Sequence, residues 1–130
     1  METQESAPLP VWVCKVLQSM AAQASVKGKE ECGLIALHED MHVIVEIPNT
    51  SEQPDNFRMS SQDLLDAWSV YGDGVVGCWH THKESEVPSV QDREYAPPGL
   101  RYWIATEDVV VEYDMSYSNP TVVHRWPNGG

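Results

Sequence analysis

The helical periodicity of residues 11–28 constrains the fold most. Apolar side chains recur there at the spacing of one helix face, namely at Val13, Leu17, Met20, Ala21 and Ala24. Pro10 suits the start of a helix and Gly28 suits its end. The sequence therefore predicts a helix, and the strand-forming runs that follow predict the sheet on which it packs.

Strand-forming residues occupy most of the remaining chain. Residues 33–49 are typical of two strands around a polar turn at Glu39 and Asp40, closed by Pro48 and Asn49. Residues 50–59 form a loop that ends in an extended piece near Phe57. Residues 74–82 predict a short central strand, and further strands are expected near 101–106, 109–115 and 121–126.

Two more helices are expected between these strands. Ser60 or Ser61 can cap a helix over residues 61–72, and the candidates for its inner face are Leu64, Leu65 and Trp68. Residues 89–96 favour a short helix. Because helices and strands do not alternate strictly, the expected fold is α+β, with a mixed β-sheet flanked by helices.

Length and composition limit the classes of function. The 130 residues predict a single domain, 1–130, whose ends at 1–9 and 127–130 are expected to be flexible. A formal charge of -12 repels phosphate backbones and anionic membranes, so nucleic-acid binding is not expected. No apolar run is long enough to span a membrane, and residues 1–10 lack the pattern of a secretion signal. Three widely spaced cysteines favour a reduced, cytoplasmic location.

The segment WHTHKESEVPSVQD, residues 79–92, carries the candidate chemistry. On a strand His80 and His82 point to the same face, together with Cys78, so both imidazoles can hold one ion. Ser89 and Asp92 have the spacing of a capped helix start. An aspartate in that first turn can add a third ligand, which leaves a zinc ion with an open, catalytic position.

A glutamate is also needed, because a base must take the proton of the water that zinc activates. Glu30 and Glu31 lie just before a strand, far from the histidines in sequence. On their own they are ordinary surface residues.

Together these segments resemble the JAMM metallopeptidases, also called the MPN or Mov34 family. The family pattern is E-x-x-G, then H-x-H, then S-x-x-D, and it is found here at 30–33, 80–82 and 89–92. Six residues separate His82 from Ser89, where the family usually has seven, and Lys83 stands at the family's usual proline. The amino-acid sequence of residues 43–82 most resembles the JAMM domain of phage tail assembly proteins of the lambda K type.

The resemblance implies a JAMM/MPN-like, cytidine deaminase-like domain and a zinc metallopeptidase. It makes His80, His82 and Asp92 the ligands of Zn²⁺, Glu30 the general base, with Glu31 as the alternative, and Ser89 the donor to the oxyanion. It also implies peptide or protein substrates, other phage tail proteins as partners, and a location in the host cytoplasm during assembly and in the virion tail.

Other functions compete with this interpretation. One is a structural tail-tip subunit that retains the JAMM fold but does not use it for catalysis. Another is a cellular isopeptidase that acts on the C-termini of ubiquitin-like or sulfur-carrier proteins. A cupin is disfavoured because Arg93 stands where its pattern needs glycine, and a serine hydrolase because no nucleophile elbow surrounds Ser89.

Overall fold

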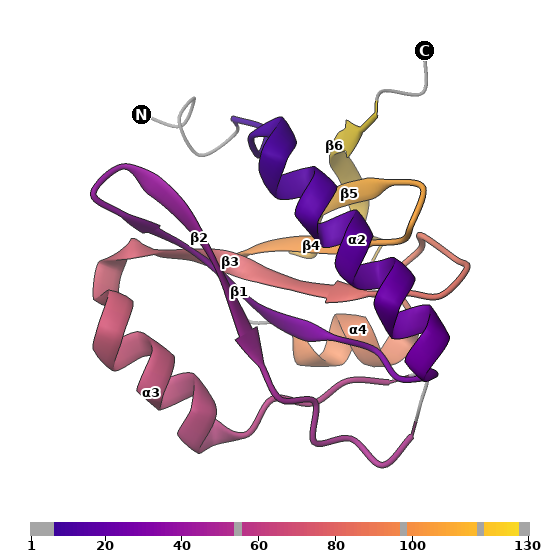
Figure 1. The fold of residues 1–130 in the computed structure, drawn as a ribbon, viewed down its shortest axis with the longest axis horizontal. Helices are drawn as coiled ribbons and strands as arrows, with labels where there is room; N and C mark the ends of the chain where they lie inside the picture. The colour runs from indigo at the N-terminus through magenta and orange to yellow at the C-terminus, as the bar shows by residue number, and fades with distance from the viewer. Residues whose placement is uncertain (1–6, 54–55, 97–98, 117–118, 128–130) are drawn as a thin grey trace.

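The computed structural model describes residues 7–53, 56–96, 99–116 and 119–127. Within them the strands form one six-stranded sheet in the order β2-β1-β3-β4-β5-β6 (Figure 1). The strands are β1 Cys32–His38, β2 Met41–Ile47, β3 Val75–Thr81, β4 Arg101–Ala105, β5 Val110–Asp114 and β6 Thr121–Trp126. Only β3 and β4 pair in parallel, and the other neighbouring strands are antiparallel. The predicted α+β class and mixed sheet are confirmed.

The helices are α2 Val11–Lys27, α3 Ser61–Tyr71 and α4 Val90–Tyr95, with a short 3₁₀ turn η1 at Gly72–Gly74. Helix α2 ends as predicted, because Gly28 adopts the left-handed conformation that glycine tolerates best (φ 77°). Of the two candidate caps of α3, Ser60 is the one used: its Oγ accepts a hydrogen bond from Asp63 N at 3.1 Å.

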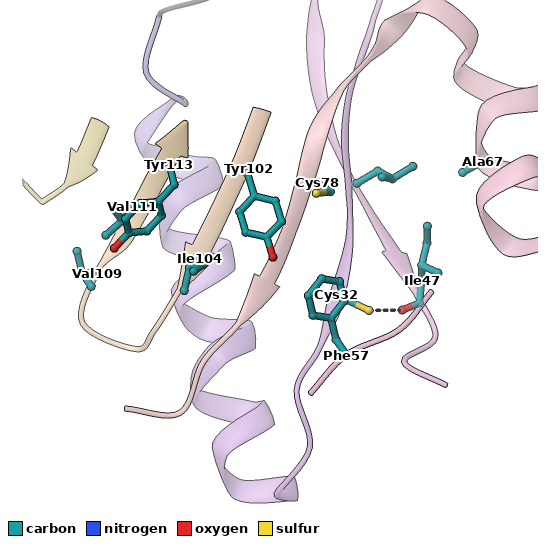
Figure 2. Packing of buried hydrophobic residues seen from close by; sticks show 11 residues of the cluster. Cys32, Ile47, Phe57, Ala67, Cys78, Tyr102, Ile104, Val109, Val111 and Tyr113 are labelled. Carbon is teal, nitrogen blue, oxygen red and sulfur yellow. Dashed lines mark hydrogen bonds between the residues drawn. The ribbon is translucent and has the colours of Figure 1, made fainter. Parts of the chain in front are cut away.

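Two apolar layers cover opposite faces of the sheet. On one face α2 packs through Val13 and Leu17 against Trp79 and Trp103. The other layer contains residues of the strands with Phe57 and with Ala67 of α3, as Figure 2 shows; its strand residues include Cys32, Leu34, Cys78, Tyr102, Ile104 and Val111. This second layer is the face toward which the candidate site points.

The turn between β1 and β2 follows the prediction. Glu39 and Asp40 both have positive φ, 52° and 66°. Two such residues in succession are typical of the tight hairpin turn whose twist matches the flanking strands.

The predicted inner face of α3 is wrong in two of its three residues. Leu65 is 64% exposed and Trp68 is 38% exposed, whereas Ala67 is buried and Leu64 packs against the second layer. Helix α3 contacts the sheet through a narrow stripe of its surface, on which Leu64 and Ala67 lie three residues apart. The apolar periodicity of the helix does not determine which stripe faces the sheet. Residues 56–60 form no strand, and Phe57 enters the core from a loop.

The ends of the chain are described only in part. Within the stretch 1–9, Leu9 is buried and Ala7 O accepts a hydrogen bond from Arg101 Nη2 at 2.6 Å. Residues 1–6 and 128–130, for which flexibility is expected, lie outside the described residues. Among the helices that are described, none combines the length and the apolar character needed to cross a bilayer.

Candidate metal centre

The two histidines stand at the end of β3. His80 shares the face of Cys78, while Trp79 points to the opposite face and packs beneath α2, as strand alternation predicts. His82 follows the strand, and its backbone N–H donates to Ala105 O at 2.9 Å, which prolongs the pairing with β4. The two Nε2 atoms therefore meet, 2.8 Å apart.

Asp92 reaches both histidines from the first turn of α4. Its Oδ2 lies 2.9 Å from His82 Nε2, and its Oδ1 lies 3.3 Å from His80 Nε2. The expected helix start is also present: Ser89 Oγ accepts from Asp92 N at 3.1 Å, and Ser89 N donates to Asp92 Oδ2 at 2.8 Å. The capping box fixes the carboxylate, so the loop of six residues is long enough to bring Asp92 to the histidines.

The three side chains fit a divalent cation. Two imidazole nitrogens and one carboxylate oxygen are ligands that zinc prefers, at about 2.0–2.2 Å each, and tetrahedral geometry then separates the ligand atoms by roughly 3.3 Å. The observed separations of 2.8 to 3.3 Å are slightly shorter. Two facing Nε2 lone pairs repel each other unless a proton or a cation lies between them, so this donor set suits a metal.

The tautomer of His82 is fixed by its other ring nitrogen. Nδ1 lies 2.8 Å from the carbonyl oxygen of Ser85. Since a carbonyl oxygen only accepts, Nδ1 carries a proton, so the neutral ring has its lone pair on Nε2, where a metal takes the place of the proton shared with Asp92. The side chain of His80 is fully buried, and its Nδ1 has no hydrogen-bond partner among the described residues.

The buried carboxylate shifts the pKa values of the cluster. Burial alone would raise the pKa of Asp92, but its hydrogen bonds with His80 and His82 hold that pKa well below its usual range. Burial lowers the pKa of His80. Burial acts in the same direction on His82, yet the hydrogen bond and charge of Asp92 raise its pKa overall. An ionised Asp92 and a neutral His80 are the forms that bind metal.

Glu30 and Glu31 have different surroundings. A carboxylate oxygen of Glu30 lies within 4.8 Å of ring nitrogens of His80 and His82, and the three could hold one ion. The carboxylate of Glu31 instead pairs with Lys27 at 3.3 Å. The structure thus brings Glu30, and not Glu31, to the histidines.

The glycine of the E-x-x-G pattern has a packing reason. A Cβ on Gly33 would lie 1.8 Å from Val45 O and 3.0 Å from Trp79 Nε1. Only glycine lets β1 approach β2 this closely at this position.

Two residues that sequence reasoning missed support the site. Asn49 donates from Nδ2 to Glu30 O at 2.9 Å and to Asn56 O at 3.0 Å, and its Oδ1 accepts from Ser51 N and Arg58 N. The loop that it organises carries Phe57, whose ring stacks on His80 with centroids 4.3 Å apart. Pro48 and Asn49 together predict only the end of a strand, and a single asparagine gives no further signal.

A cleft of about 840 Å³ opens beside the cluster. Its lining combines the C-terminal end of α2 with the loop after β3, and includes Ala24, Ser25, Gly28, Glu30, His82 and Ser89. The predicted site residues Glu30, His82 and Ser89 thus border one open space, while His80 and Asp92 are buried behind it.

Comparison with known proteins places the chain in a family. Residues 14–126 match the Prok-JAB family, described as prokaryotic homologues of the JAB domain. The chain belongs to this family. The JAMM/MPN resemblance is confirmed at this level, and JAB-family relatives are hydrolases.

Two relatives illustrate the similarity. The JAB-family chain is 33% identical over 88 residues to a protein named desampylase from Haloferax volcanii. That match covers 61% of this chain and 63% of the relative, so less than two thirds of the relative is represented. Protein DSY2949 from Desulfitobacterium hafniense has a similar fold, with a TM-score of 0.66, 21% identity and 82% of each chain covered.

Proposed function

We propose that this JAB-family protein is a zinc-dependent isopeptidase that hydrolyses the amide bond at the C-terminus of a ubiquitin-like protein. One observation carries the proposal: donor atoms of His80, His82 and Asp92 converge at 2.8 to 3.3 Å, with the carboxylate of Glu30 beside them at the cleft. The family, its hydrolase relatives and the desampylase similarity support the same class of reaction.

Each residue has a role in this proposal. Zinc held by His80, His82 and Asp92 would polarise the scissile carbonyl and acidify a water. Glu30 accepts the proton of that water and passes it to the leaving amine. Ser89 Oγ accepts from Asp92 N, so its own hydrogen remains available to donate to the oxyanion.

The cleft favours a substrate with small side chains near the scissile bond. The wall contributed by the C-terminal half of α2 and its cap consists of the small residues Ala21, Ala24, Ser25 and Gly28, whose side chains project little into the cleft. An extended tail that ends in glycines can lie against such a wall of small residues without a steric clash. The C-terminal tails of ubiquitin-like and sulfur-carrier proteins, which end in glycines, fit this description of the substrate.

Hydrolysis of a defined conjugate tests the proposal. The substrate is a ubiquitin-like carrier that ends in Gly-Gly, joined through its C-terminal carboxyl to the lysine Nε of a fluorescent peptide. The zinc-loaded protein should release the peptide, and a chelator should stop the release. No cleavage of such conjugates by zinc-loaded protein would refute the proposed activity.

A matched pair of variants tests the cleft. Ser25→Phe places a ring in the cleft and leaves every metal donor unsubstituted, whereas Gln23→Phe adds the same ring on an exposed position of α2 outside the lining. Ser25→Phe should reduce cleavage strongly, and Gln23→Phe should not. Equal rates in the two variants would place the substrate elsewhere.

A role in a phage tail is the second candidate. The resemblance of residues 43–82 to phage tail assembly proteins favours this role. The substrate of the protein would then be a peptide segment of a tail or cell-wall component. Mass spectrometry of purified tail particles tests this role. Presence of the chain in virions would support it, while absence, together with cleavage of the Gly-Gly conjugate, would favour the isopeptidase.

A further inference from the structure

The loop between β3 and α4, residues 83–88, is anchored to strands that do not neighbour β3 in the sheet. Starting at His82, it crosses beyond β4 and contacts strands β5 and β6. The contacts are made by Glu86: its backbone O accepts from Tyr113 Oη at 2.6 Å, and its carboxylate forms an ion pair with Arg125.

The register of the sheet brings the two anchoring side chains together. Arg125 stands opposite Val111 on the neighbouring strand, so their side chains share a face. Val111 and Tyr113 are two apart on β5, and both belong to the apolar layer on the side of the metal cluster. Tyr113 and Arg125 therefore project toward the same loop from adjacent strands.

The anchored residue is next to the one that orients His82. Ser85 O accepts the Nδ1 proton of His82 at 2.8 Å, and Ser85 Oγ accepts from Val87 N at 3.1 Å. The turn around Glu86 is thus held by a hydrogen bond between Ser85 and Val87 and by the contacts of Glu86 with β5 and β6. Any shift of Glu86 would move the carbonyl that fixes the ring of His82.

We propose that Glu86, held by Tyr113 and Arg125, is a positioning residue that keeps the His82 imidazole in the orientation and tautomer required to bind the metal. The inference rests on the metal site of the proposed function and adds residues that the signature does not contain. Because it acts on a ligand and not on a reacting atom, its first effect is on metal affinity.

Tyr113→Phe and Glu86→Gln are the informative variants. The first removes one hydroxyl and leaves the buried ring, and the second removes the charge and leaves the backbone. Their controls are Tyr71→Phe on α3 and Glu107→Gln in the exposed turn after β4, which make the same chemical changes away from the loop. Zinc and Co²⁺ affinity of the full chain is measured by competition with a chromophoric chelator, without substrate.

Loss of an outer contact to a ligating histidine typically weakens metal binding by about 10- to 100-fold. We expect losses in this range for Tyr113→Phe and Glu86→Gln, and unchanged affinity in the two controls. The double variant should lose less than the product of the two single losses, because both act through the same carbonyl. Wild-type affinity in both single variants would overturn the positioning role.

A second readout uses the metal-free protein. Long-range ¹H–¹⁵N spectra of the imidazoles, recorded at a pH at which the ring is neutral, should show His82 protonated at Nδ1 in the wild type and as a mixture of tautomers in Glu86→Gln. An unchanged Nδ1–H form in a folded variant would also overturn the proposal. A wild type that binds no zinc would refute the proposed function, whereas the tautomer measurement would still decide the role of Glu86.

Discussion

Nε2 of His80 lies 2.8 Å from Nε2 of His82, and the carboxylate of Asp92 contacts both rings. One residue separates the histidines along β3, while the aspartate comes from a helix ten positions later. Strand β3 sets the positions of the two histidines, and the capping box of α4 sets the position of the Asp92 carboxylate. A metal site built this way depends on the sheet and on the start of α4 together.

Zinc content is the first prediction. The wild type should bind one zinc per chain through His80, His82 and Asp92, at about 2.0–2.2 Å in tetrahedral geometry. Replacing both histidines by alanine should abolish binding, because one carboxylate cannot hold the ion alone. Mass-spectrometric metal analysis and X-ray absorption measure these quantities.

The control for this double variant removes two histidines elsewhere. His38 and His42 lie at the β1–β2 hairpin, so their replacement by alanine should leave the zinc content unchanged. Full zinc content in the His80/His82 double variant would show that the metal is bound at another place.

Glu30→Gln should retain zinc and lose hydrolysis by about 10²–10⁴-fold, because an amide does not accept the proton of the attacking water. Glu31→Gln is the matched control, since the carboxylate of Glu31 pairs with Lys27 instead of facing the histidines. Initial rates with the Gly-Gly conjugate compare the two. A large loss only in Glu31→Gln would transfer the role of base to Glu31.

Asn49→Ala should affect both stability and activity. The variant leaves up to four backbone groups without their partner, among them Glu30 O, and each buried unpaired group costs about 1–3 kcal/mol. Partial solvent access reduces this cost, so we expect a total loss of about 2–4 kcal/mol in urea unfolding. Hydrolysis should also fall, because the segment of Glu30 loosens.

Asn49→Asp separates the two halves of this network. The aspartate keeps an acceptor for Ser51 N and Arg58 N but has no N–H for Glu30 O. It should fold better than Asn49→Ala and still lose activity. If both variants keep wild-type rates, Asn49 supports the loop only.

Much of the fold could be predicted because its signals are local. Gly28, Ser60 and Ser89 end or start helices through their own backbone or hydroxyl, and strand alternation alone places His80 and Trp79 on opposite faces. The pairing of Glu30 with distant histidines came from the family pattern, since nothing in the local sequence distinguishes Glu30 from Glu31.

The remaining features depend on tertiary packing. Asn49, Phe57 and Glu86 act through contacts with segments remote in sequence, and no periodicity marks them. The exposure of Leu65 similarly depends on where α3 lies on the sheet, which the helix does not determine by itself.

The three cysteines give two further predictions, of which the first concerns their reactivity. All are free and buried, and burial raises the pKa of Cys14 to about 11, that of Cys32 to about 12 and that of Cys78 further still. Because only the thiolate is nucleophilic, the folded protein should resist a disulfide reagent at pH 8, and all three thiols should react in urea.

The same shifts predict alkaline destabilisation. The pKa in the folded state exceeds the unfolded value of 9.0, so the unfolded chain loses protons first as the pH rises. The stabilising contribution is therefore complete below pH 9 and is lost as the pH rises toward the folded pKa values. Each thiol contributes up to about 1.4 kcal/mol per pH unit to the slope. Cys14→Ala should make the decline between pH 9 and 10 shallower by about 1 kcal/mol per pH unit in urea unfolding, and an unchanged slope would contradict the burial of this thiol as its cause.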